Sequence, residues 1–140
     1  MATVQPVAAS RSSIGSRIVA AGAWGIGVWT THLFLNVLTS GLQWTLVAAF
    51  LLQIVMTAGE SPLWRGRVRW FNIVILILDA ITNVGGFFSY LIRLDQTDSW
   101  AAFNAGLGLN GGISPLAALV VALALGIIVA ATPAFLWRQE

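Results

Sequence analysis

The chain has 140 residues, of which 58% are hydrophobic and 9% are charged, and its mean hydropathy is +0.86. Soluble domains of this size carry about 25% charged residues, so the composition excludes an ordinary soluble domain and predicts an integral membrane protein with a single transmembrane domain. The net charge of +2 gives no indication of a nucleic-acid partner, and the absence of cysteine excludes disulfides, thiolate metal sites and cysteine nucleophiles.

Four hydrophobic segments are long enough to cross a bilayer, whose core of about 30 Å needs about 20 apolar residues per helix. They cover residues 17–38, 42–58, 70–92 and 116–137 and predict an all-α, four-helix transmembrane bundle. The first segment is too long for the core of a signal peptide, so we expect it to be retained. Residues 1–13 are expected to form a flexible tail, and residues 98–107 a short interfacial helix in the second outer loop.

The seven arginines are distributed unevenly between the two ends of these spans. Six of them fall on one side, and Arg93 alone falls on the other; the six are Arg11, Arg17, Arg65, Arg67, Arg69 and Arg138. Because positively charged loops stay cytoplasmic, we expect both termini on the cytoplasmic side of a bacterial-type plasma membrane. We interpret Arg65, Arg67 and Arg69 as topology determinants, with binding of anionic lipid headgroups as the alternative.

The first two spans carry isolated polar and small residues. Gly22 and Gly25 are candidates for helix packing, and His32 and Asn36 lie in the outer half of the first span. We interpret His32 as a packing residue that hydrogen-bonds to a neighbouring helix; a proton relay, a metal ligand or a pigment ligand are the alternatives. In the second span, Gln53 belongs to a weaker polar stripe.

The third span has a polar stripe along its full length. Asn72, Asp79, Asn83, Gly86 and Tyr90 follow one another at spacings of seven, four, three and four residues, which places them on one helical face. A carboxylate in the middle of a span costs about 2.5–3.5 kcal/mol, and no arginine of the chain lies at the same depth. We expect one of three states for Asp79. It is protonated and hydrogen-bonded to Asn83, Gln53 or a backbone carbonyl; it is ionised and faces water; or it pairs with a cation from outside the chain.

Small residues recur every four positions along the fourth span. They are Ser114, Ala118, Ala122, Gly126, Ala130 and Ala134. Such stripes allow two helix backbones to approach closely. The stripe predicts a packing surface, either against the other helices of the same chain or against a second protomer.

No catalytic motif appears in the sequence. The chain has no HExxH motif and no Ser-His-acid set, and we interpret Glu60, Asp95, Asp98 and Glu140 as carboxylates scattered outside the membrane. We therefore expect no enzyme, no metal site and no cofactor. The leading hypothesis is a homo-oligomeric channel in which Asp79 forms a cation-selective ring. The alternatives are a non-catalytic subunit of a larger membrane complex and a small proton-coupled transporter that uses Asp79 as its carrier.

Overall fold

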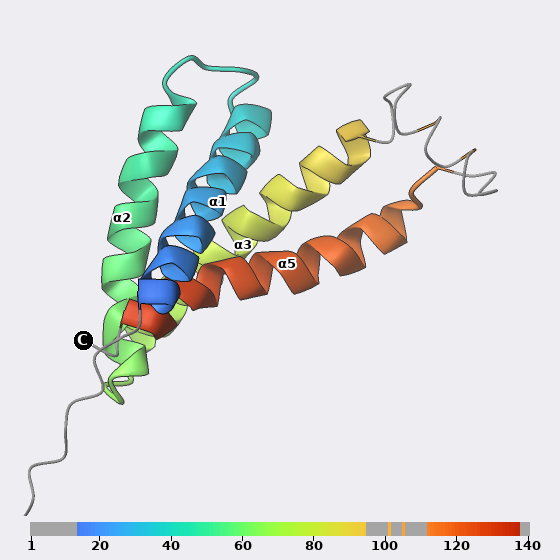
Figure 1. Ribbon diagram of the computed structural model, residues 1–140. Helices are drawn as coiled ribbons and strands as arrows, with labels where there is room; N and C mark the ends of the chain where they lie inside the picture. The colour runs from blue at the N-terminus through green and yellow to red at the C-terminus, as the bar shows by residue number, and fades with distance from the viewer. Residues whose placement is uncertain (1–13, 95–100, 102–104, 106–111, 138–140) are drawn as a thin grey trace, which may run out of the picture.

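The computed structural model describes residues 14–94, 101, 105 and 112–137, and this part of the chain contains helices and no strand. Four long helices account for it: α1 (Ile14–Leu38), α2 (Thr45–Trp64), α3 (Trp70–Leu94) and α5 (Pro115–Trp137) (Figure 1). Each is long and apolar enough to cross a membrane. Within the described residues, the prediction of an all-helical fold with four helices that could span a membrane is therefore confirmed, and it is consistent with a multi-pass membrane protein.

The helix bounds differ most from the expected ones in α2. This helix begins at Thr45 and continues to Trp64, whereas the sequence predicted residues 42–58, and Pro62 lies inside its last turns. Glu60 is therefore part of a candidate membrane span and not part of a loop. The expected N-terminal tail and the expected interfacial helix over 98–107 fall outside the described residues, apart from positions 101 and 105.

Two tight turns connect the first three helices, and both use a backbone conformation with positive φ. After α1, Ser40 and Gly41 have φ values of 54° and 91°, and the Gly41 N–H donates to the Asn36 carbonyl at 3.0 Å. After α2, Gly66 has φ 74°, and the Arg67 N–H donates to the Pro62 carbonyl at 2.9 Å. These six-to-one hydrogen bonds satisfy carbonyls at the helix ends, so each helix stops and the chain reverses direction.

The fourth helix starts at a well-formed N-terminal cap. The Ser114 side-chain oxygen accepts a hydrogen bond from the Ala117 N–H at 3.1 Å, and Pro115 occupies the first helical position. Proline is favoured there because its missing N–H would have no partner in the helix. The sequence had placed Pro115 just outside the helix.

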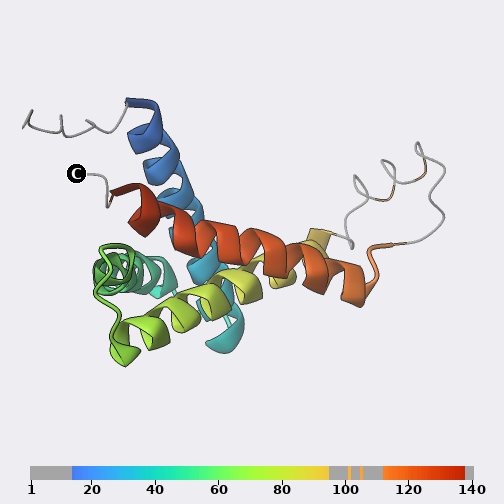
Figure 2. The same ribbon diagram turned by 90° about the horizontal axis from the view of Figure 1, so that it is seen from below.

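The helices pair as two hairpins that meet at one end and diverge at the other. Figures 1 and 2 show α1 beside α2, and α5 running along α3, with the second pair at a wide angle to the first. The start of α1, the connection from α2 to α3 and the end of α5 all lie at the end where the pairs meet (Figure 1). The opposite end carries the α1–α2 turn and the end of α3.

Close contacts between helices occur at glycines and alanines. A Cβ atom at Gly86 would collide with the Thr30 backbone of α1, and one at Gly126 would lie 2.7 Å from the Val84 nitrogen of α3. The small residues of α5 turn inward, and Ala118, Ala122, Gly126, Ala130 and Ala134 are all buried. This small-residue stripe therefore packs against the helices of its own chain.

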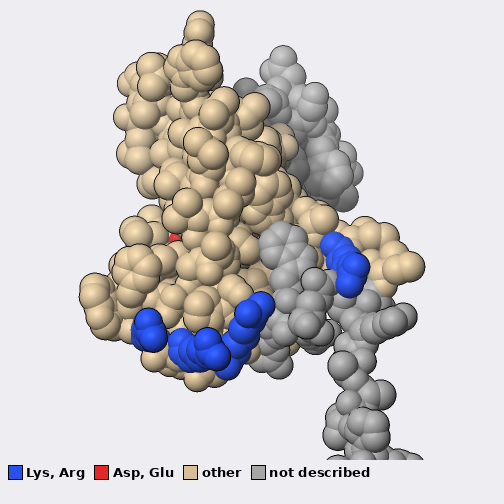
Figure 3. Space-filling view, turned by 90° about the vertical axis from the view of Figure 1, so that its left-hand side faces the viewer, with Lys and Arg blue, Asp and Glu red and all other residues tan. Residues whose placement is uncertain are grey.

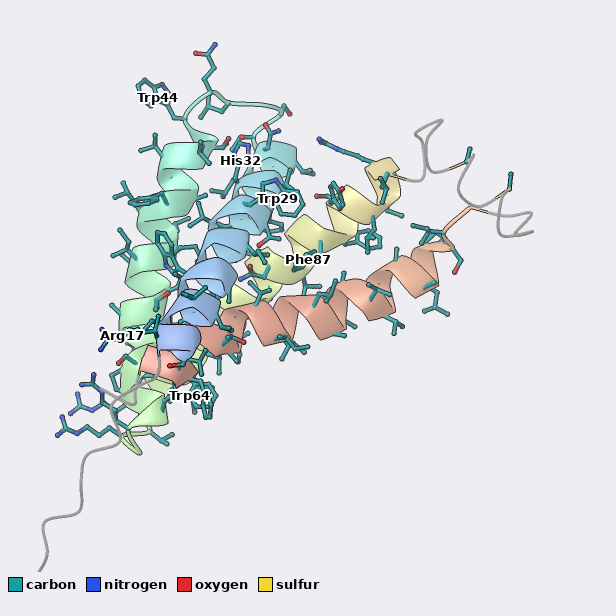
Figure 4. The ribbon with its side chains drawn as sticks, viewed as in Figure 1. Arg17, Trp29, His32, Trp44, Trp64 and Phe87 are labelled. Carbon is teal, nitrogen blue, oxygen red and sulfur yellow. The ribbon has the colours of Figure 1, made fainter. Side chains whose placement is uncertain are left out.

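The outer surface of the helices is apolar, and the described arginines other than Arg93 lie at one end. Large hydrophobic side chains are exposed on all four helices, as expected where lipid covers them. Figure 3 shows the arginines as a band along the lower edge, while acidic atoms reach this face only as a small spot. Figure 4 places Arg17 and Trp64 at the end where the hairpins meet, and Trp44 at the opposite end.

Candidate functional site

A group of polar side chains lies buried where α1, α2 and α3 meet. We call it the polar core; its members are Thr30, Thr31, Gln53, Glu60, Asp79, Thr82 and Asn83, and none is more than 8% exposed. Asp79 and Asn83 belong to the polar stripe that the sequence predicted on the third span. Gln53 comes from the polar stripe predicted on the second span. The structure shows that α1 and α2 of the same chain cover the stripe of the third span from Asn72 to Gly86, whereas Tyr90 stays partly exposed.

Asp79 is the central hydrogen-bond acceptor of the polar core. Its Oδ1 atom accepts a hydrogen bond from Gln53 Nε2 of α2 at 2.6 Å and another from Asn83 Nδ2, one turn along α3, at 2.8 Å. Both amides were among the partners expected from the sequence. Asp79 is therefore held by two neutral donors from two helices.

The threonines of α1 connect this centre to the first helix. Thr30 donates a short hydrogen bond to Asn83 Oδ1, and Thr31 accepts one from Gln53 Nε2 at 3.0 Å and donates to Thr82 Oγ1 at 3.3 Å. Nothing in the sequence singles out these threonines, because a threonine in a helix also satisfies its hydroxyl on its own backbone. Their role follows from the close approach of α1 to α3 at Gly86.

Glu60 is the second buried acid, and the sequence interpretation placed it outside the membrane. Its side chain is 0% exposed, and its carboxyl faces that of Asp79. No donor among the described residues reaches either carboxyl oxygen of Glu60. Because both groups are carboxyls, a hydrogen bond between them requires a proton, and no arginine acts on either group within the described residues.

Asn72 marks the same contact between α2 and α3, nearer the arginines. Its Nδ2 donates to the Gly59 carbonyl at 2.5 Å, while its buried Oδ1 has no hydrogen-bond partner among the described residues. Asn72 also lines a hollow of about 750 Å³ at this end of the molecule, together with Pro62, Arg67, Val68, Arg69, Trp70 and Phe71. Asn72 thus lies between this hollow and the helix turn that carries Glu60.

Other predicted site residues lie apart from the polar core. His32 shares a hydrogen bond of 3.0 Å between its Nδ1 and Thr45 Oγ1, which links α1 to the start of α2. Tyr90 is 39% exposed, and its ring packs against Trp29 at 5.0 Å between centroids. Trp29 also contacts Phe87, and Figure 4 shows these two rings between α1 and α3. Asn36 is half-buried near the end of α1.

Within the part of the chain that the structure describes, the predicted packing glycines of α1 do not contact another helix. Gly22 and Gly25 are exposed, and a Cβ atom at either would meet nothing within 4 Å. The close contact on α1 is at Gly27 instead, where a Cβ atom would lie 3.0 Å from Gln53 Oε1. A glycine pattern indicates where a close approach is possible, but it does not show which side has a partner.

Comparison with known proteins gives no family for the chain: no family model matches it, and no curated protein or solved structure is significantly similar. The chemistry of the site must therefore be argued from its own groups. Within the described residues, no three His, Cys, Asp or Glu side chains gather at one place. The polar core instead contains the facing carboxyls of Asp79 and Glu60. Neutral amides donate to Asp79, whereas no amide or hydroxyl among the described residues donates to Glu60.

Proposed function

We propose that the protein is a small proton-coupled membrane transporter in which Asp79 and Glu60 take up and release the coupling protons. The observation that carries the proposal is the burial of two facing carboxyls that no arginine neutralises among the described residues. Ionisable groups inside transmembrane segments commonly form proton relays and ion pathways. Two carboxyls in contact can be neutralised by protons, and they become available for a positively charged solute when those protons leave.

The alternative that the acids only hold the helices together has less support. Gln53, Asn83 and the threonines already link α1, α2 and α3 through neutral groups. A structural polar group in a membrane protein is expected to be satisfied by hydrogen bonds, yet within the described residues the carboxyl of Glu60 meets only a second carboxyl, that of Asp79, and no neutral donor. Burial of Glu60 is therefore unfavourable for stability, and no contact with a neutral donor compensates for it.

A ring of Asp79 side chains around a pore between copies also has less support. The polar face of α3 packs against α1 and α2, and Asp79 is 2% exposed within one chain. A pore-lining face would have to be presented outward. Assembly into a homo-oligomer remains part of the proposal, because the exposed surface of α1 at Gly22 and Gly25 leaves room for close approach by a helix of a second copy.

The proposed orientation places the arginine end in the cytoplasm of a bacterial-type cell. Arg65, Arg67 and Arg69 are exposed in the connection between α2 and α3, at the same end as the start of α1 and the end of α5. The positive-inside rule then puts both termini in the cytoplasm. In this orientation the hollow beside Asn72 opens towards the cytoplasmic side, and the three arginines lie at the level of the lipid headgroups.

Reconstitution into liposomes tests the proposal. The purified protein is reconstituted with a pH-sensitive dye inside, a pH gradient is imposed, and monovalent, divalent and organic cations are added outside in turn. We expect the wild type to dissipate the gradient faster with a transported cation, and Asp79→Asn and Glu60→Gln to abolish this response. Glu140→Gln, which neutralises a carboxyl beyond α5, is the matched control and should respond like the wild type. Equal rates for the wild type and Asp79→Asn with every cation would refute the proposal.

A further inference from the structure

Glu60, Asp79 and Asn72 lie along one seam between two antiparallel helices. Gln53 and Glu60 are seven residues apart on α2, and Asn72 and Asp79 are seven residues apart on α3, so each pair shares a helical face. Two hydrogen bonds fix the register: Gln53 to Asp79 at 2.6 Å, and Asn72 to the Gly59 carbonyl at 2.5 Å. Glu60 directly follows Gly59 on α2, and its carboxyl faces that of Asp79 from this end of the seam.

This stretch of the seam contains acceptors without donors. Both carboxyl oxygens of Glu60 and the Oδ1 atom of Asn72 are buried, and apart from the facing carboxyl of Asp79 no hydrogen-bonding group among the described residues reaches them. Glu60 is 0% and Asn72 is 7% exposed. Buried polar atoms are rarely left unpaired, and an exception in a native fold calls for a ligand or another specific explanation. A ligand that suits a set of acceptor oxygens carries positive charge.

We propose that this seam binds a hard divalent cation, which is exchanged for the two carboxyl protons. The proposal rests on the proton-coupled function above and names the solute for it. The charges balance, because a divalent cation binds to the two carboxyls as two protons leave, and the site is neutral before and after. A neutral site matters here because an uncompensated charge is costly in a region of low dielectric.

The oxygen-only character of the site selects the class of cation. Carboxylate and amide oxygens suit Mg²⁺, Ca²⁺ and Mn²⁺, whereas Zn²⁺ and Cu²⁺ prefer sites with imidazole or thiolate. His32, the single histidine, is engaged with Thr45 between α1 and α2, and the chain has no cysteine. Mg²⁺ is commonly held by one or two carboxylates, so the facing carboxyls of Glu60 and Asp79 can supply its protein ligands.

The hollow at the arginine end is the route by which the cation reaches the seam. Asn72 lines this hollow and contacts the turn of α2 that carries Glu60. Arg67 and Arg69 also line it, and their charge lowers the local concentration of cations. We therefore expect Arg67→Gln to accelerate cation entry, and the difference from the wild type to shrink at high ionic strength.

Binding is measured on the purified protein in detergent, without transport. The midpoint of thermal unfolding is followed against the concentration of Mg²⁺, Ca²⁺ or Mn²⁺, with Na⁺ at matched ionic strength as the control, and Mn²⁺ binding is followed by electron paramagnetic resonance. We expect a saturable rise in the midpoint for the wild type and at least a tenfold weaker affinity for Glu60→Gln and Asp79→Asn. Glu140→Gln should bind like the wild type. Each variant is first compared with the wild type in the absence of divalent cations, which separates loss of binding from loss of folding.

Release of protons is measured in the same samples with a pH indicator in weakly buffered solution, and two protons are expected per cation bound. A wild-type midpoint that responds equally to divalent cations and to Na⁺ would overturn the site, and so would unchanged affinity in both variants. Coupled proton flux with monovalent or organic cations alone would overturn this inference and leave the proposed transporter intact. Saturable binding of a divalent cation without proton release or flux would support a cation site and refute the proton-coupled function.

Discussion

The contact between α1 and α3 at Gly86 gives the sharpest test of the helix packing. An added Cβ atom at Gly86 would lie 2.7 Å from Thr30 Cα and closer still to the Thr30 carbonyl, whereas ordinary contacts begin at 3.4 Å. The neighbour is backbone, so no side-chain rotation can relieve the overlap. Gly86→Ala therefore requires α1 and α3 to separate by 0.7 Å or more, the difference between these two distances.

The expected magnitude follows from comparison with a glycine that has free space around it. Gly22 also lies inside a long helix, but a Cβ atom there would meet nothing within 4 Å. Both substitutions gain the helix propensity of alanine, about 1 kcal/mol in a soluble helix. The difference between Gly86→Ala and Gly22→Ala removes this contribution and leaves the cost of overpacking, about 1–3 kcal/mol. We expect a value near the upper end, because separation of the helices also stretches the bond from Thr30 to Asn83.

The free energy of unfolding of both variants is measured in mixed micelles with increasing fractions of a denaturing detergent. We expect Gly86→Ala to unfold at a clearly lower fraction than Gly22→Ala, with the wild type at or slightly below Gly22→Ala. Equal stability of the two variants would show that α1 and α3 do not approach each other at Thr30 and Gly86. The geometry of the polar core would then have to be abandoned as well, since the threonines reach Asn83 and Thr82 only through this approach.

Three further predictions concern the polar core and the orientation. Gln53→Leu removes two interhelical hydrogen bonds and should lower the free energy of unfolding by about 1 kcal/mol, at roughly 0.6 kcal/mol per bond. Gln43→Leu in the exposed turn is the control and should change the free energy of unfolding little. Equal losses in the two variants would contradict the hydrogen bonds of Gln53 in the polar core. Glu60→Gln should leave the stability unchanged or raised, because an amide is less costly to bury than a carboxyl, and a loss above about 2 kcal/mol would instead make Glu60 structural. Since the chain has no cysteine, Val68→Cys and Gln43→Cys can be labelled singly in intact cells: an impermeant thiol reagent should modify position 43 from outside and spare position 68, and the reverse pattern would invert the proposed topology.

Helical periodicity was sufficient to find one half of the candidate site. The seven-residue spacing from Asn72 to Asp79 and the four-residue spacing to Asn83 place all three on one face, and all three are buried. The same reasoning selected Gln53, which donates to Asp79. Periodicity cannot show which helices cover a polar face, however. The sequence therefore left open whether the polar face of the third span is shielded from lipid by helices of the same chain or of another copy.

Glu60 was missed because the end of α2 resembles a loop. Gly59 and Pro62 flank it, and both residues disfavour the interior of a helix. The helix nevertheless continues, and Gly59 allows the approach of Ile75 from α3. A usable signal was present, since Gln53, Thr57 and Glu60 follow at spacings of four and three and extend the polar stripe of the second span. That stripe would have placed Glu60 on the same face as Gln53.

The number of acids in this chain strengthens the case for a role in exchange rather than in packing. The sequence contains five acidic residues, and two of them, Glu60 and Asp79, face each other in the polar core. A carboxylate at the centre of a span, the position of Asp79, costs about 2.5–3.5 kcal/mol, while asparagine there would supply hydrogen-bonding groups of similar size without a charge. The property that the acids have and the amides lack is the ability to bind and release a proton, which switches them between a neutral and a negatively charged form. Asp79 accepts hydrogen bonds from the neutral amides of Gln53 and Asn83, and Glu60 lies next to the turn that Asn72 connects to the hollow. We infer that this arrangement suits an exchange of protons for a cation.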